Sequence, residues 1–310
     1  MWGLPLFVRR LYHTATMNCQ CEHQLMPSKL AGRLSALGAA IMWSSSGFFV
    51  KSPVFLDWPS ESRGVLLAFW RAAFALVLLL PLVRTPRWRP GLVPLMVSFA
   101  AMSGTFLTSM TLTTAANAIW LQMTAPFWVL VFGVLLGERV LRRDLLPLVA
   151  ALAGVGLIVC YEAGGKDIVG VVMGLLAGLA YGWVVLLLRR MKNENQAWLV
   201  AVCHVGAVLL LAPWAVASGV APSWFQLLVL AGFGMLQMAV PYLLMARALR
   251  SISSHEAVAI GLLEPVLQPV WVYLAWGEQP AWWTIIGAGF ILCGLAARYL
   301  IALFGSNTTA

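Results

Sequence analysis

Residues 115–138 read AANAIWLQMTAPFWVLVFGVLLGE, and residues 257–278 read AVAIGLLEPVLQPVWVYLAWGE. Both stretches are apolar, carry an internal proline and end in Gly-Glu. An α-helix needs about 20 predominantly apolar residues to cross the hydrocarbon core of a bilayer, and each stretch is long enough. The two stretches therefore predict membrane-spanning helices, and their likeness indicates a repeated unit within the chain.

The composition of the whole chain supports a membrane protein. Of its 310 residues, 61% are apolar and only 10% are charged, whereas soluble domains carry about 25% charged residues. The formal net charge of +9 would suggest a nucleic-acid partner in a soluble protein. Here the basic residues form short clusters between apolar runs, so we expect the lipid bilayer as a partner and no nucleic acid.

Ten apolar runs are long enough to form spanning helices. The fifth run is short, and only two residues separate the third run from the fourth, which implies a tight turn. The expected helices are Leu30–Val50, Gly64–Val83, Leu92–Leu112, Ala115–Gly137, Leu145–Tyr161, Ile168–Leu188, Ala197–Val216, Trp224–Ala246, Ala257–Trp276 and Trp283–Leu303.

The distribution of Lys and Arg gives the expected orientation, because cytoplasmic loops of membrane proteins carry an excess of these residues. With the N-terminus inside, sixteen of them fall on the cytoplasmic side and three fall outside, namely Lys51, Arg63 and Lys166. Arg71 lies within the second run. We therefore expect a multi-pass protein of the cell (inner) membrane with both termini in the cytoplasm.

Further matches extend the repeat along the chain at a nearly constant offset. Trp43 matches Tyr181 at an offset of 138, and Pro126 matches Pro265 at an offset of 139. Each half then holds five helices, an odd number, so the second half enters the membrane upside down. Arginines follow the second and fourth helices of the first half, but the first and third of the second half. The expected fold is an all-α integral membrane protein with ten transmembrane helices arranged as two inverted five-helix repeats.

The domain boundaries follow from this repeat. We expect the first five-helix repeat at residues 30–161 and the second at residues 168–303, with a disordered cytoplasmic leader at 1–29 and a cytoplasmic tail at 304–310. The leader lacks the continuous apolar region and the cleavage site of a secretory signal. Its segment Cys19-Gln20-Cys21-Glu22-His23 resembles a fragment of a metal site, but a structural zinc site needs four ligands on a folded support. No metal and no cofactor are therefore expected.

Three features together carry a family resemblance. They are the two segments in which proline is followed by Gly-Glu, the start of the second run at Phe69-Trp70-Arg71, and the aromatic residue in the first helix of each half. Over about residues 31–303 the chain resembles the EamA-type families of the drug/metabolite transporter superfamily. One departure is that twelve residues separate Pro126 from Glu138, where similar proteins usually have thirteen. The resemblance implies a ten-helix exporter or permease for small metabolites, most commonly amino acids and related compounds.

Two charged residues lie about eight residues inside apolar runs, where a charge is costly and usually faces a cavity or a partner. In a functional interpretation, Arg71 binds a substrate carboxylate through paired hydrogen bonds. Glu264 then binds a substrate amine or carries a proton. In the alternative interpretation, the two residues form a structural pair, or Arg71 extends its charge to the outer surface.

Prolines and further polar residues mark the same runs. A proline frees a backbone carbonyl, which at membrane depth needs a partner or a water-lined cavity. Pro126, Pro265 and Pro269 are therefore expected to kink the fourth and ninth helices and to shape a cavity wall. Polar groups can equally bind helices together, which leaves packing as the alternative explanation. The substrate-binding candidates are Glu264, Arg71, Trp43, Asn117, Trp120 and Gln268.

Inverted repeats allow two halves to exchange inward-facing and outward-facing shapes around a midplane site. We therefore predict a secondary transporter of a small-molecule substrate that works by alternating access; a homodimer is compatible with this reading. An intramembrane enzyme is disfavoured, because the predicted spans contain no aspartate and no His-Glu-x-x-His pattern. A passive solute channel stays open as the main alternative.

Overall fold

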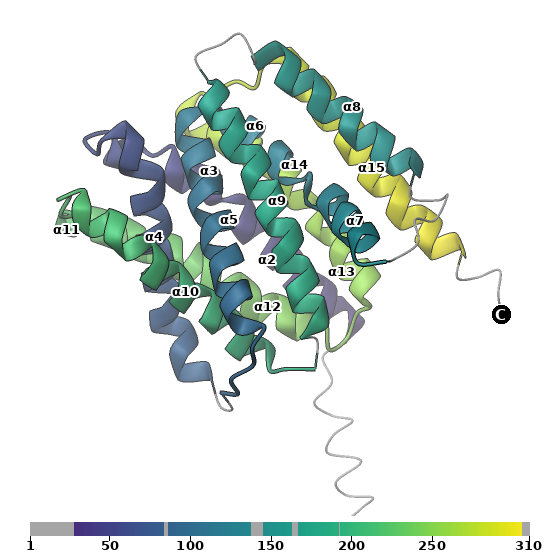
Figure 1. Ribbon diagram of the computed structural model, residues 1–310, viewed down its shortest axis with the longest axis horizontal. Helices are drawn as coiled ribbons and strands as arrows, with labels where there is room; N and C mark the ends of the chain where they lie inside the picture. Colours follow the sequence, from purple (N-terminus) through teal and green to yellow (C-terminus); the bar gives the residue numbers. More distant parts are fainter. Residues whose placement is uncertain (1–27, 84–85, 138–144, 163–166, 192, 306–310) are drawn as a thin grey trace, which may run out of the picture.

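The computed structural model describes residues 28–83, 86–137, 145–162, 167–191 and 193–305. The leader cluster around Cys19, Glu138 and most of the tail predicted at 304–310 lie outside these residues. Every regular element in the described ranges is a helix (Figure 1). The elements are α2 (Lys29–Ser44), α3 (Ser46–Val50), η1 (Pro53–Phe55), α4 (Ser60–Leu79), η2 (Leu80–Leu82), α5 (Leu92–Leu112), α6 (Ala115–Gln122), α7 (Ala125–Leu135), α8 (Leu145–Glu162), α9 (Ile168–Arg190), α10 (Gln196–Ala217), α11 (Trp224–Gly234), η4 (Met235–Ala239), α12 (Val240–Ala248), α13 (Ser254–Gly261), α14 (Leu263–Trp276) and α15 (Trp282–Gly305).

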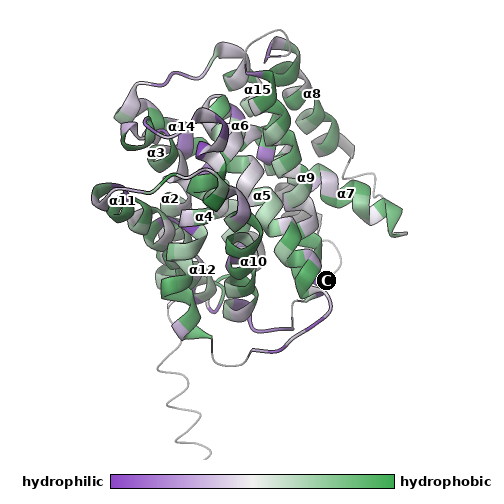
Figure 2. Ribbon diagram, turned by 60° about the vertical axis from the view of Figure 1, so that its left-hand side comes forward, coloured by the Kyte–Doolittle hydropathy of each residue, from purple (hydrophilic) through white to green (hydrophobic). Residues whose placement is uncertain are grey.

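These elements form ten helical stretches within the described residues, which confirms the all-helical fold and the number of helices. Seven stretches are long and apolar enough to cross a membrane, and Leu148–Glu162 and Trp282–Ala297 are shorter apolar helices. The first stretch is divided between α2 and α3. Figure 2 shows apolar residues along most of the helical length. Large apolar side chains such as Leu228 and Leu274 are mostly exposed, as expected of surfaces that face lipid.

The ends of the fourth and ninth stretches are built alike in the two halves. Thr114 and Ser253 precede α6 and α13, and each side chain accepts a hydrogen bond from a backbone N–H in the first turn. Such caps satisfy donors that have no partner within the helix. After α7 and α14 stand Gly137, with φ 87°, and Gly277, with φ 69°, a left-handed conformation that glycine adopts without strain. The repeat seen in the sequence therefore recurs in local backbone geometry.

Four stretches are interrupted near their middle. The first breaks at Ser45, the fourth between Gln122 and Ala125, and the ninth at Leu262. The eighth passes through η4, a π-helical segment between α11 and α12. Interrupted backbone at membrane depth is tolerated where protein or a water-filled cavity satisfies its polar groups.

Two of the three prolines lie just beyond these breaks. Pro126 is in the first turn of α7, and Pro265 is the third residue of α14. The first turn of a helix suits proline, because the N–H groups there have no intrahelical acceptor. Pro269 lies inside α14. The sequence placed kinks at the prolines, whereas the structure places the breaks a few residues before Pro126 and Pro265.

Helices of the first half pack mainly against helices of the second. α5 lies along α9 and α2 along α12, while α4 packs on α10 and α8 on α15. Figure 1 shows α8 and α15 side by side along one edge of the molecule. The two backbones meet at Gly154 and Gly287, where an added methyl group on either glycine would collide with the other's carbonyl oxygen. Small residues allow this close approach between helices in a membrane.

Candidate functional site

A buried cavity of about 220 Å³ lies where the interrupted helices meet. The eight stretches other than α8 and α15 all contribute to its wall. Its apolar side chains come largely from α5, α9 and α10. Its polar and charged side chains are Ser46, Arg71, Gln122, Tyr181, Gln237, Tyr242 and Glu264.

Helix interruptions deliver four of these polar residues to the cavity. Ser46 begins α3 directly after the break at Ser45, and Gln122 is the last residue of α6. Gln237 lies at the centre of η4, and Glu264 lies in the first turn of α14. Helix ends at the membrane midplane are the usual means by which transporters present polar groups to a solute.

Arg71 lies on α4 and is 3% exposed. Its guanidinium donates from Nη2 to Ser103 Oγ at 2.7 Å, and its Cζ atom lies 5.3 Å from the centroid of the Phe233 ring. Among the described residues no carboxylate lies within ion-pair distance of Arg71. A guanidinium has five N–H donors in a fixed plane, so this side chain can still bind an anion in a bidentate manner.

Glu264 is half-buried and lies in the same cavity wall as Arg71. The N-terminal end of a helix favours a negative charge, and Glu264 is the second residue of α14. Within the described part of the chain its carboxyl group makes no hydrogen bond and no ion pair. The cavity therefore presents one cationic and one acidic side chain, which are not joined to each other.

Aromatic rings form a large part of the same wall. The ring of Trp43 meets that of Tyr242 edge to face at 5.3 Å between centroids. Behind Tyr242 lies the buried side chain of His204, whose Nδ1 is 2.8 Å from Val200 O and whose ring is 5.0 Å from that of Phe99. Trp43 and Tyr181, which match in the sequence repeat, both line the cavity. Aromatic faces can hold the apolar part of a solute or an ammonium group.

The other three substrate-binding candidates lie outside the cavity wall. Gln268 donates to Ala115 O and accepts from Ser46 Oγ at 2.7 Å, so it joins α14 to α6 and α3. Asn117 binds Glu162 and Thr284. Trp120 is 4% exposed within an apolar cluster. The structure thus brings Trp43, Arg71 and Glu264 together at the cavity. The other three candidates contact neighbouring helices instead.

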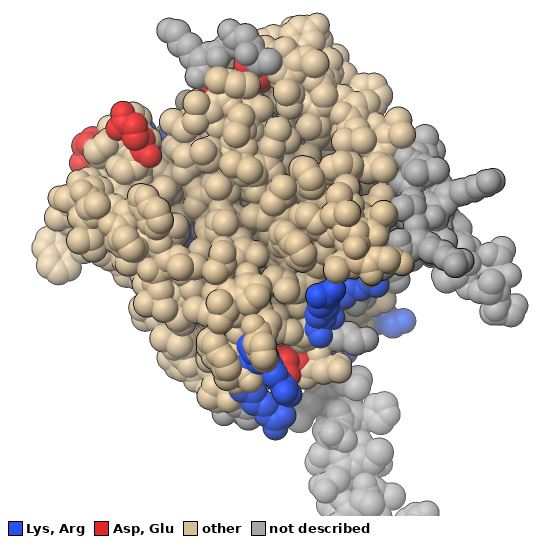
Figure 3. Space-filling model, in the orientation of Figure 1, with Lys and Arg blue, Asp and Glu red and all other residues tan. Residues whose placement is uncertain are grey.

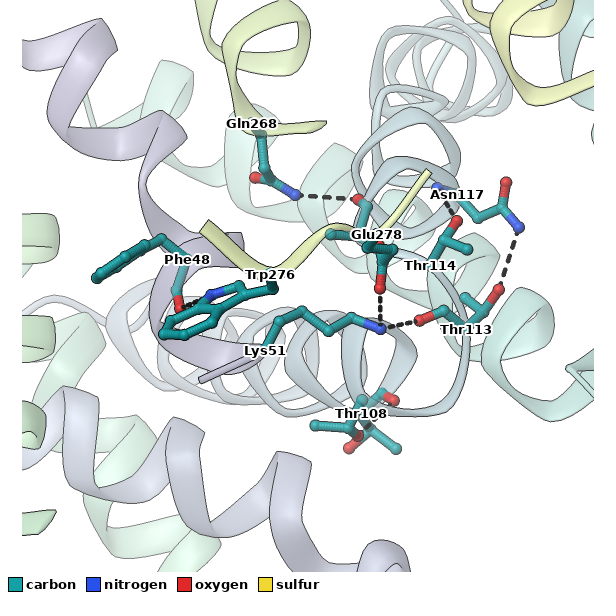
Figure 4. Close-up of polar contacts among 11 residues, drawn as sticks. Phe48, Lys51, Thr108, Thr113, Thr114, Asn117, Gln268, Trp276 and Glu278 are labelled. Atoms are coloured by element: carbon teal, nitrogen blue, oxygen red, sulfur yellow. Dashed lines mark hydrogen bonds and ion pairs between the residues drawn. The ribbon is translucent and has the colours of Figure 1, made fainter. Parts of the chain in front are cut away.

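A second polar cluster, called the outer network because it lies outside the cavity wall, joins Lys51, Glu278 and Thr113 (Figure 4) to the backbone of Ala115. Lys51 Nζ lies 2.7 Å from Glu278 Oε2 and donates to Thr113 O. Glu278 Oε1 accepts from the backbone N–H of Ala115, the first residue of α6. Beside the network, Trp276 Nε1 donates to a backbone carbonyl of α3. The ends of α3, α5 and α14 are thereby fastened together.

The sequence contained a weak sign of this network. Lys51 was one of the three basic residues expected outside, and Glu278 closed one of the two matching Gly-Glu segments. Their pairing was not foreseen, because 227 residues separate them and neither segment predicts a contact with the other.

Apolar helices that are interrupted around a central cavity are typical of membrane transporters. The EamA-like transporter family model matches residues 30–160 and again residues 168–299. The chain belongs to this family, and its halves are duplicated copies of one domain. The predicted resemblance is confirmed: the protein is a multi-pass membrane transporter and not an enzyme.

Individual proteins agree with this assignment. Two uncharacterized transporters of Archaeoglobus fulgidus are 27% and 26% identical to this chain over 234 and 276 residues. The alignments cover 74% and 82% of this chain, and 84% and 92% of the relatives. One solved crystal structure matches with a TM-score of 0.63 at 16% identity, over 89% of this chain and 99% of that one. This last likeness shows the fold alone.

Proposed function

We propose that this protein is a secondary transporter, an exporter or permease, of small metabolites such as amino acids. The observation that carries the proposal is that Arg71 and Glu264, of opposite charge, share one buried cavity at which four interrupted helices meet. A zwitterion complements such a cavity, because its carboxylate pairs with the guanidinium and its ammonium with the carboxylate. The aromatic residues Trp43 and Tyr242 then contact its apolar part.

Alternating access of two inverted halves is the mechanism that we propose for this transport. Packing of α5 on α9 recurs as packing of α12 on α2, as expected if a two-fold axis in the membrane plane relates the halves. The opposite placement of arginines in equivalent loops supports the same arrangement. Figure 3 shows Lys and Arg gathered toward one end of the face that it draws, with a broad uncharged area above them. We assign that end, and both termini, to the cytoplasm.

In this proposal the structure represents an inward-facing conformation. The cavity wall continues from Arg71 to Leu188 and Val200, which lie close to the end of α9 and the start of α10. That end carries Arg189 and Arg190 and is the proposed cytoplasmic side. At the opposite end the outer network fastens α3, α5 and α14 to one another. The solute would therefore enter from, or leave to, the cytoplasm in this shape.

Flux measurements in liposomes test the proposal against a passive channel. The purified protein is reconstituted, and the uptake of each of a panel of radiolabelled amino acids is measured with and without the unlabelled compound inside. An alternating-access transporter should carry label faster into preloaded vesicles. The reason is that a carrier loaded with internal compound returns to the outside quickly. Uptake that preloading leaves unchanged would favour the channel.

A further inference from the structure

The π-helical segment η4 places one glutamine, Gln237, in the cavity wall. Single π-helical turns are rare and occur frequently at functional sites. The segment follows Gly234, where an added methyl group would collide with the backbone carbonyl oxygen of Arg71. The eighth stretch therefore enters η4 in direct contact with the α4 backbone at Arg71, which fixes the position of Gln237 relative to the charged cavity.

The orientation of the Gln237 amide follows from its neighbour. Nε2 lies 3.0 Å from the backbone oxygen of Trp43, next to the break in the first stretch. A carbonyl oxygen accepts hydrogen bonds and cannot donate, so the NH₂ end of the amide must face it. The two ends of an amide are otherwise hard to distinguish. Here the chemistry leaves one assignment, in which Oε1 points away from Trp43 O.

The Oε1 atom is a buried acceptor with no protein donor. Gln237 is 3% exposed, and among the described residues nothing donates to Oε1. Native proteins rarely leave such an oxygen without a hydrogen bond, because its desolvation is then not compensated. Gln237 and Glu264 both line the cavity, so a solute bound there would lie next to this unpaired acceptor.

We propose that Gln237 is a substrate-binding residue that accepts a hydrogen bond, through Oε1, from the amino group of the transported solute. This inference rests on the proposed function and deepens it. Glu264 and Gln237 together recognise the amino group, while Arg71 recognises the acidic end. Gln237 then selects for solutes that carry an N–H donor, because a carboxylate or carbonyl at the same place would face a second acceptor.

Two substitutions separate this role from a merely structural one. Gln237→Met keeps the length of the side chain and removes both the donor and the acceptor. Gln237→Glu keeps an acceptor oxygen and loses the amide donor to Trp43 O. Gln226→Met is the matched control, since Gln226 is 6% exposed, lies on α11 of the same stretch and donates to Val54 O at 2.9 Å, away from the cavity.

Binding to the detergent-solubilised protein is measured by the change in tryptophan fluorescence. The twenty L-amino acids are screened first, and the one that binds the wild-type protein most tightly is compared with its analogue lacking the amino group, such as L-phenylalanine with 3-phenylpropionate. Dissociation constants for both ligands are then determined for the three variants, together with their thermal unfolding midpoints.

We expect Gln237→Met to weaken binding of the amino acid about tenfold or more and to leave binding of the analogue unchanged, since a hydrogen bond to a charged group is lost. Gln237→Glu should keep the preference for the amino acid, and Gln226→Met should lower the unfolding midpoint without changing the preference. Equal losses for both ligands in both Gln237 variants would overturn the assignment. Failure of every amino acid to bind the wild-type protein would overturn the proposed function, and the assignment with it.

Discussion

The outer network and the central cavity each contain one basic and one acidic side chain, but the two pairs differ in their contacts. Lys51 and Glu278 lie 2.7 Å apart, and each also binds a backbone group of the α5–α6 turn. Arg71 and Glu264 share a cavity without forming an ion pair. Charges at membrane depth are costly unless they are paired or used. In the proposed function, the first pair closes one end of the protein and the second binds the solute.

The largest effect is expected when the cation of the cavity is removed. Arg71→Ala should reduce flux in liposomes about a hundredfold, equivalent to about 2.7 kcal/mol, because charge-assisted hydrogen bonds to the solute are lost. Arg63→Ala is the control on the same helix, since Arg63 binds the backbone oxygens of Leu56 and Trp58. Wild-type flux in Arg71→Ala would show that the cavity charge is not used.

A smaller loss is expected at the acidic side of the cavity. Glu264→Gln keeps the shape of the side chain and removes its charge, and it should reduce flux about tenfold. In the wild-type protein, lowering the pH protonates the carboxyl group and should weaken binding of an amine-bearing solute. That pH dependence should be flattened in Glu264→Gln when flux is measured between pH 5 and 8. An unchanged pH profile in the variant would show that Glu264 does not bind the solute.

Breaking the outer network should change access rather than affinity. Glu278→Gln removes the ion pair but keeps an oxygen for the N–H of Ala115, so the start of α6 stays capped. We expect a cysteine introduced at Ser46 to react several-fold faster with a membrane-impermeant thiol reagent added from outside. The native cysteines are first replaced by serine. Labelling of Glu278→Gln as slow as that of the protein without this substitution would contradict a role of the ion pair in access.

The same substitution should have little effect on stability. The side chains of Lys51 and Glu278 are 20% and 22% exposed, and ion pairs in contact with solvent contribute about 0–1 kcal/mol. A large drop in the thermal unfolding midpoint of Glu278→Gln would indicate that the network supports the fold and does not control access.

The smallest effect on transport is expected at the indole beside the outer network. Trp276→Phe removes the hydrogen bond from Nε1 to Phe48 O and keeps the stacking of the ring on Phe48. It should cost about 1 kcal/mol of stability, seen as a slightly lower unfolding midpoint, with flux unchanged. A flux defect in this variant would extend the transport machinery to the helix ends.

Hydropathy was sufficient to locate the helices, because a bilayer demands long apolar runs. Hydropathy also identified Arg71 and Glu264 as candidates, because a charged residue stands out within an apolar run. Gln268 and Asn117 interrupt their runs in the same way, yet they bind neighbouring helices. Whether a polar residue faces a cavity or another helix depends on how its helix is rotated, and packing between distant segments sets that rotation.

The interruptions themselves were predicted only in part. Prolines marked the fourth and ninth stretches, but no proline lies next to the break at Ser45, where three serines follow one another. The π-helical turn around Gln237 had a local signature that was not used, because Pro241 follows it in the first turn of α12 and lacks the N–H that a regular helix would direct to the Gln237 carbonyl. Both interruptions deliver residues to the cavity.

The pairing of α8 with α15 has a practical consequence. These last helices of the two halves meet through Gly154 and Gly287 and contribute no described residue to the cavity wall. In the proposed transport cycle we therefore expect this pair to act as a stator, a part that stays still while the remaining helices rearrange around the solute. A reporter group or a fused binding partner attached there would follow the protein through its transport cycle without obstructing it.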